Sequence, residues 1–99
     1  MIPFKQVSAI VKESIRSSEI GEGDKIRLEI ATSQFLDRLL PKYSEELGFE
    51  YILLTSMFLA GQEIGLDLTP FDINQMCESD NVAWLHHIES FADLGRELR

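Results

Sequence analysis

The residues that could do chemistry in this sequence lie close to its end. His86 and His87 are adjacent, and carboxylates follow at Glu89 and Asp93. In a helix, His86, Glu89 and Asp93 would share one face, because side chains three, four and seven residues apart lie on the same side. Imidazole and carboxylate groups bind transition metals, but a site needs three or four ligands converging on one ion. We therefore favour solvated polar side chains over a metal site.

The single cysteine, Cys77, is the other group with reactive potential. It follows Met76, and no lysine or arginine lies near it in sequence to lower its thiol pKa. We expect a small buried side chain and not a nucleophile. One cysteine forms no intramolecular disulfide, so a reducing, cytoplasmic compartment is expected. Motifs for phosphate binding, thiol redox chemistry and calcium binding are absent, and we predict no enzyme and no cofactor.

Charge is distributed very unevenly along the chain. The 99 residues carry 17 acidic and nine basic side chains, a net charge of −8. Seven bases lie in residues 1–42, whereas residues 43–95 contain ten acids and no lysine or arginine. Residues 55–74 have the outline of a helix-turn-helix motif but carry no cation for phosphate contacts. We therefore expect a plain helical corner there and no direct binding of nucleic acid.

Six of the acids form the candidate partner-binding set; Glu46 is predicted to lie in a first helical turn, and the other five have no local structural role. The six acids occur as three pairs spaced by four residues: Glu46 and Glu50, Glu63 and Asp67, and Glu89 and Asp93. The first and last pairs would lie within helices, where two exposed like charges at this spacing cost about 0.2–0.5 kcal/mol. The pattern predicts an acidic surface that binds a basic surface of a protein partner. The alternative interpretation is a solvated acidic face without a partner.

Apolar residues that recur at three and four positions predict helices along the whole chain. The expected helices cover residues 3–19, 24–40, 45–64, 70–78 and 80–94. The predicted fold is therefore all-α, a compact bundle of four to five helices in one domain of residues 1–99. Charged and apolar residues alternate in 25–31, so a short strand is the alternative there.

Several residues are expected to mark helix ends. Asp24 and Ser44 are predicted N-caps, and Pro41 is predicted to end the helix before it by forcing Leu40 out of helical geometry. Gly65 is predicted to end the third helix in the left-handed conformation.

The third and fourth helices have the clearest patterns. Two adjacent apolar stripes in 45–64 predict a central helix that is buried on most of its surface. Thr69, followed by Pro70 and then by Asp72, predicts a capping box at the start of the fourth helix.

Together these patterns predict a cytoplasmic, non-enzymatic protein-binding module, an acidic inhibitor or adaptor that covers a basic surface of its partner. Its size and acidity would also suit nucleic-acid mimicry, as in phage-encoded antagonists of host proteins. The alternative is a structural or assembly subunit that acts as a helical homodimer. A third class is a small metal-binding helical enzyme that uses His86, Glu89 and Asp93. No stretch has the ~20 apolar residues that a membrane span needs.

Overall fold

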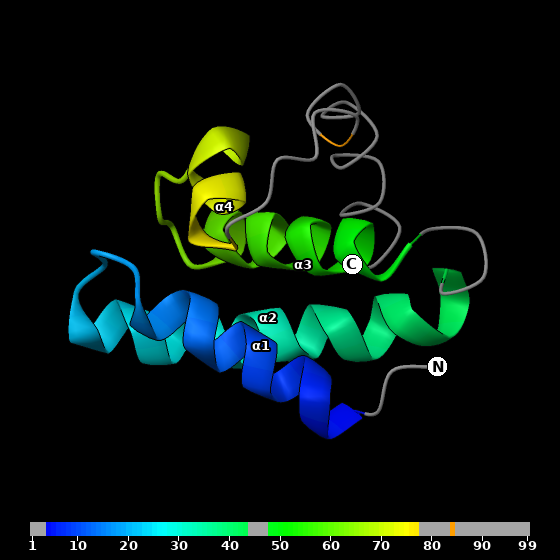
Figure 1. Cartoon of the computed structure of the whole chain (residues 1–99). Helices are drawn as coiled ribbons and strands as arrows, with labels where there is room; N and C mark the ends of the chain where they lie inside the picture. Colours follow the sequence, from blue (N-terminus) through cyan, green and yellow to red (C-terminus); the bar gives the residue numbers. More distant parts are fainter. Residues whose placement is uncertain (1–3, 44–47, 78–83, 85–99) are drawn as a thin grey trace.

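The computed structural model describes residues 4–43, 48–77 and 84. Four helices follow one another: α1 (Phe4–Arg16), α2 (Glu22–Tyr43), α3 (Phe49–Glu63) and α4 (Pro70–Met76). In Figure 1, α2 and α3 lie along one another, α1 lies against α2, and α4 packs at one end of α3. The described residues contain no strand, and the predicted all-α fold is confirmed.

Residues 25–31 are helical, so the alternative of a strand is wrong. They lie inside α2, where Leu28 is buried while Ile26 and Ile30 are 62% and 56% exposed. A helix satisfies its backbone N–H and C=O groups internally, whereas a lone strand would leave them without partners. The alternation in this stretch therefore places two isoleucines on the outer side of α2.

The start of α2 differs from the prediction. The helix begins at Glu22, because the backbone N–H of Lys25 donates to the carbonyl of Gly21 at 2.9 Å and closes the first turn. Asp24 is therefore the third residue of the helix and not its N-cap. Its negative charge still favours the helix dipole at this position.

The boundary between α2 and α3 also differs from the prediction. Leu40 and Pro41 both lie within α2, which continues to Tyr43. Proline removes one helical hydrogen bond, and here less than one turn of helix follows it. The N-cap of α3 is Gly48, in an extended conformation without a side-chain cap, and not Ser44. Residues 44–47 lie outside the described part of the chain.

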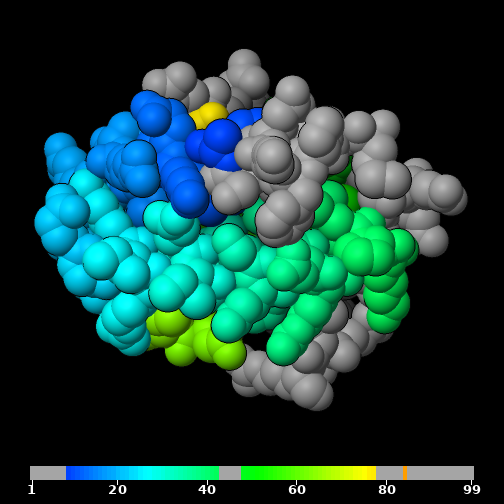
Figure 2. All heavy atoms as spheres, turned by 90° about the horizontal axis from the view of Figure 1, so that it is seen from below, coloured from blue at the N-terminus to red at the C-terminus, as the bar shows by residue number. Residues whose placement is uncertain are grey.

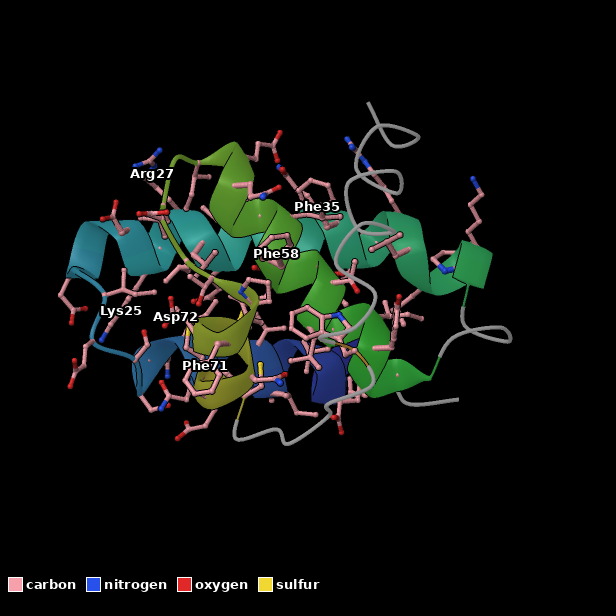
Figure 3. The ribbon with its side chains drawn as sticks, turned by 90° about the horizontal axis from the view of Figure 1, so that it is seen from above. Lys25, Arg27, Phe35, Phe58, Phe71 and Asp72 are labelled. Atoms are coloured by element: carbon pink, nitrogen blue, oxygen red, sulfur yellow. The ribbon has the colours of Figure 1, made fainter. Side chains whose placement is uncertain are left out.

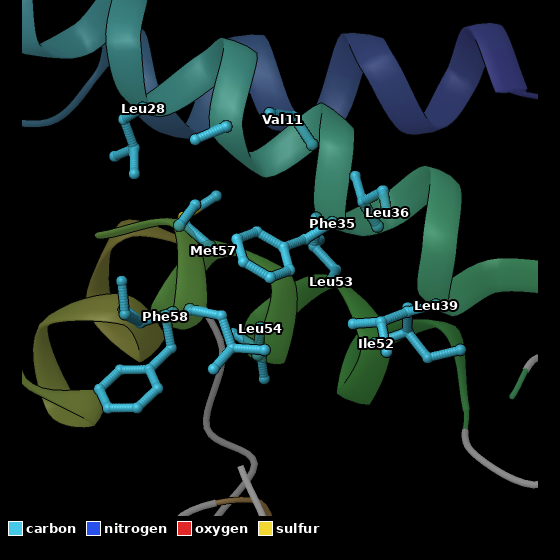
Figure 4. Packing of buried hydrophobic residues seen from close by; sticks show 14 of the residues in the cluster. Val11, Leu28, Phe35, Leu36, Leu39, Ile52, Leu53, Leu54, Met57 and Phe58 are labelled. Carbon is cyan, nitrogen blue, oxygen red and sulfur yellow. The ribbon is translucent and has the colours of Figure 1, made fainter. Parts of the chain in front are cut away.

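The third helix is buried over most of its length, as its two apolar stripes predict. Ten consecutive residues, Ile52–Gly61, are buried. In Figure 4, Phe35 of α2 points toward Met57 and Leu39 of α2 points toward Ile52, so the two helices share one apolar core.

A buried tryptophan covers another part of α3. Trp84 is fully buried, and its indole Nε1–H donates to Oγ1 of Thr55 at 3.0 Å. Its ring meets Phe58 edge-on, with centroids 6.4 Å apart and an interplanar angle of 83°. Trp84 is the one described residue in the segment 80–94, for which the sequence predicts a further helix.

Gly65 ends α3 in the predicted conformation. Its φ of 82° lies in the left-handed region. The N–H of Leu66 donates to the carbonyl of Gly61 at 2.9 Å, and that of Gly65 donates to Gln62 at 3.2 Å. These two bonds define a Schellman motif, which satisfies carbonyls that have no partner inside the helix.

The predicted capping box at the start of α4 is confirmed. Oγ1 of Thr69 accepts from the backbone N–H of Asp72 at 3.1 Å, and the Asp72 carboxylate accepts from the N–H of Thr69 at 2.9 Å. The helix ends at Met76, two residues before the predicted end. Within the described ranges, no helix combines the length and apolar character that a bilayer crossing requires.

Candidate functional site

The structure describes three of the six acids that are predicted to bind a partner. Glu50 lies in the first turn of α3, Glu63 is the last residue of α3, and Asp67 lies in the loop to α4. Glu63 follows Glu50 by thirteen positions of helix, about 20 Å at 1.5 Å per residue. The structure thus places Glu63 and Asp67 at the end of α3 that leads into α4, and Glu50 at the opposite end.

Other predicted site residues lie outside the described part of the chain. They include three acids of the partner-binding set: Glu46, Glu89 and Asp93. His86, which would act with Glu89 and Asp93 in a metal-binding enzyme, also lies outside the described part of the chain. Within 4–43, 48–77 and 84, no group of three or more histidine, cysteine, aspartate or glutamate side chains is placed to hold a metal ion.

Two cations at the start of α2 bind the ends of neighbouring helices. Nζ of Lys25 donates to the carbonyl of Arg16, the last residue of α1, at 2.9 Å. Nη2 of Arg27 donates to the carbonyl of Ile64, the C-cap of α3, at 3.0 Å. Figure 3 labels both side chains on α2. Carbonyls at a helix C-terminus lack helical donors and carry partial negative charge, so cations are favourable there.

Lys12, Lys25 and Arg27 also pair with acids of the same two helices. The three ion pairs are Arg27–Asp24 at 3.2 Å, Lys25–Glu22 at 3.5 Å and Lys12–Glu29 at 3.9 Å. Glu63 and Asp67 are exposed, and neither forms an ion pair with a described residue. Their charge is therefore not neutralised by direct contact with these cations.

A groove of about 490 Å³ lies between the α1–α2 loop and α4. Residues 17–20 line one side, and the other side consists of Leu68, Asp72, Gln75 and Met76. A smaller hollow of about 220 Å³ extends to Cys77. Ser17 and Met76 line both this hollow and the groove. The two hollows therefore adjoin.

The groove combines apolar and acidic side chains. Ile20, Leu68 and Met76 are half-buried and pack against the core. Glu19 and Asp72 add two carboxylates, and the described lining residues include no lysine or arginine.

An exposed aromatic ring lies beside the groove. Phe71 is 61% exposed, and Gln75, four residues further on, lies on the same side of α4. Figure 3 shows Phe71 on the outer side of this helix, next to Asp72. The sequence does not reveal this site, because residues 17–20 and 68–76 lie about fifty positions apart. The sequence signal for this site is Phe71, an aromatic residue in the first turn of α4. Residues two positions apart point to different sides of a helix, so Phe71 faces outward when Ile73 is buried.

Cys77 is half-buried and has a raised thiol pKa. Burial raises the pKa of its thiol to about 11; the negative charge of Glu50 acts in the same direction, and a hydrogen bond with Ser14 opposes both. Its Sγ lies 3.9 Å from Sδ of Met57. Such a thiol is almost wholly protonated at neutral pH, and only the thiolate is a good nucleophile. The sequence predicts a buried side chain here, and the structure shows one that is half-buried.

Comparison of the chain with protein-family models, with curated protein sequences and with solved structures finds no match. Function is therefore inferred from the residues and their geometry.

Proposed function

We propose that this chain is a cytoplasmic, non-enzymatic protein-binding module, an acidic inhibitor or adaptor that engages a basic surface of a protein partner. The supporting observation is the unequal use of charge. Lys12, Lys25 and Arg27 bind helix ends or acids of α1 and α2, whereas Glu63 and Asp67 are exposed without an ion pair among the described residues. Such carboxylates are available to attract an incoming basic partner, which speeds encounter and disfavours acidic competitors.

The sharper form of the proposal concerns the nature of the basic surface. A net charge of −8 in 99 residues suits a target surface that otherwise binds nucleic acid, because such surfaces are rich in lysine and arginine. The chain would then act by covering that surface.

Affinity capture with charge-reversed variants tests the proposal. Wild type, Glu63→Lys and a control, Asp37→Lys, are immobilised and exposed to a lysate of the source organism at low salt and at about 0.5 M salt, where exposed charges are screened. Asp37 is also exposed and lies on α2, so both variants change the net charge equally. Wild type and the control should capture the same protein at low salt and release it at high salt. Glu63→Lys should capture much less.

Two outcomes contradict the proposal. If the three proteins capture the same partner equally, the acids at the end of α3 do not engage it. If no protein is captured in a salt-dependent way, the chain has no basic partner.

A homodimer is the second candidate, and the two exposed isoleucines of α2 favour it. Ile26 and Ile30 are spaced by four residues and therefore lie on one side of the helix. Figure 2 shows α1 and α2 side by side, with α2 running across the middle of that face of the molecule. Two isoleucines are few against the ~800 Å² per partner of a standard interface. Sedimentation of the wild type and of the double variant Ile26→Glu/Ile30→Glu tests this candidate. A wild type that is dimeric and a double variant that is monomeric support the homodimer. A monomeric wild type excludes it.

A further inference from the structure

We infer that the groove between the α1–α2 loop and α4 is the docking site for a basic amphipathic segment of the partner protein, one that carries an arginine or lysine beside an apolar side chain. This inference rests on the proposed function and specifies where the partner binds and which chemistry it must present.

The hydrogen-bonding groups of the groove favour a ligand rich in donors. The hydroxyl of Ser17 donates to the carbonyl of Glu13 at 2.8 Å, and that of Ser18 donates to the carbonyl of Ile15. With their protons used on the backbone, both serine oxygens can only accept further hydrogen bonds. The side chain of Glu19 adds a carboxylate, which is also an acceptor.

The opposite side of the groove adds further acceptor capacity. In Asp72, Oδ2 accepts from the backbone N–H of Thr69, and Oδ1 has no protein donor within the described residues. Gln75 contributes an amide. A guanidinium group offers five donors and an ammonium group three, and neither accepts. A cationic side chain therefore complements this lining better than a neutral or anionic one.

The apolar part of the groove fits the rest of such a segment. Ile20, Leu68 and Met76 offer half-buried apolar surface against which the methylene stem of a lysine or arginine can pack. At the edge, Phe71 exposes 61% of its surface to solvent. Aromatic side chains, phenylalanine included, are enriched in protein interfaces, where a partner covers their apolar surface.

Phe71 also argues for a polypeptide and against a small amine. Its ring does not line the groove but lies beside it on α4. A ligand that reaches the carboxylates and the ring together has to extend beyond the groove. An amphipathic helix does so, since it presents cationic and apolar side chains three and four residues apart.

Two matched pairs of variants test the inference with a defined probe. The probe is a fluorescein-labelled helical peptide with arginine and leucine three and four residues apart, and its affinity is measured by fluorescence anisotropy. Glu19→Lys reverses a charge in the groove, and Asp37→Lys reverses one on α2. Phe71→Ala removes the ring beside the groove, and Ile26→Ala shortens a side chain of equal exposure on α2. Circular dichroism confirms that each variant keeps its helices.

We expect Glu19→Lys and Phe71→Ala each to weaken peptide binding about tenfold, and the two α2 variants to bind within twofold of wild type. A peptide with citrulline in place of arginine should bind weakly, because it lacks the charge. A peptide that keeps arginine but has serine in place of leucine should also bind weakly. If the serine peptide binds as tightly as the probe, the groove recognises charge alone and the inference is wrong. The same conclusion follows if spermine binds with the affinity of the probe and displaces it.

The results also separate this inference from the proposed function. Peptide binding could depend on salt and be abolished by Glu63→Lys, yet be unchanged in Glu19→Lys and Phe71→Ala. This result would overturn the groove as the docking site and leave the proposed function standing. Absence of salt-dependent binding, both to the peptide and in the affinity capture, would overturn both.

Discussion

The buried hydrogen bond between Trp84 and Thr55 offers the sharpest test of packing around α3. The indole N–H donates to Oγ1 at 3.0 Å, and the two residues are 0% and 1% exposed. Neither group is exposed to water, so removal of one partner deprives the other of this buried hydrogen bond. The change Thr55→Val keeps the shape of the side chain and replaces the accepting hydroxyl with a methyl group.

The expected loss is a substantial part of the stability of a domain this small. An unpaired buried donor costs about 1–3 kcal/mol, and the added methyl group offsets part of it, so Thr55→Val should lower the free energy of unfolding by about 1.5 kcal/mol. Trp84→Phe should cost about 2–3 kcal/mol, because it also leaves a cavity. In the double variant no partner is left unpaired, and its cost should fall short of the sum by about 1 kcal/mol.

The neighbouring residue supplies a control. The hydroxyl of Ser56 is also buried but has no hydrogen-bond partner among the described residues. Ser56→Ala should therefore change the stability by less than about 0.5 kcal/mol. Unfolding in urea is followed by far-ultraviolet circular dichroism, since the chain has one tryptophan and its fluorescence is lost in Trp84→Phe and in the double variant. Equal stability of Thr55→Val and wild type, or strict additivity in the double variant, would refute the reasoning.

Three further predictions concern helix ends and the thiol. Gly65→Ala should cost about 1 kcal/mol of unfolding free energy, because φ is 82° while the space around it is open; no loss in a urea titration would contradict this. Thr69→Ala should cost about 1 kcal/mol and Thr69→Ser much less, because serine keeps the acceptor for the Asp72 N–H; equal losses would count against the capping box. The pKa of Cys77 is raised from its ordinary 9.0 to about 11, so alkylation by iodoacetamide should be slow at pH 8 and rise up to about pH 11. Because the unfolded thiol ionises first, stability should fall as the pH rises from about 9 to 11, and Cys77→Ala should remove that part of the fall.

Conformations that depend on neighbouring residues could be predicted from the sequence. Gly65 and the Thr69–Asp72 box act within a few positions, and the structure places both as expected. The start of α2 after Gly21 and of α3 after Gly48 was missed, because a glycine cap contributes no side chain for recognition. The helix through Pro41 was missed because the loss of one hydrogen bond is small where little helix follows.

The candidate site was less predictable than the fold. The uneven charge drew attention to Glu63 and Asp67, whose exposure the structure now gives. The groove depends on the approach of residues 17–20 to residues 68–76, and no periodicity or local pattern encodes such a contact. Glu19 was overlooked because it lies in a stretch of balanced charge. It lines the groove only because α4 approaches it from far along the chain.

The complete burial of Ile52–Gly61 determines how this protein can change during evolution. A helix at a domain surface has an outer side on which substitutions accumulate freely, one or two in each turn. This segment has no such side, so a larger or smaller residue anywhere in it alters a volume shared with a neighbouring element. Saturation mutagenesis should reveal ten adjacent intolerant positions in place of a helical periodicity. Lasting substitutions there would require compensating changes elsewhere in the core, whereas the outer side of α2 would diverge one residue at a time.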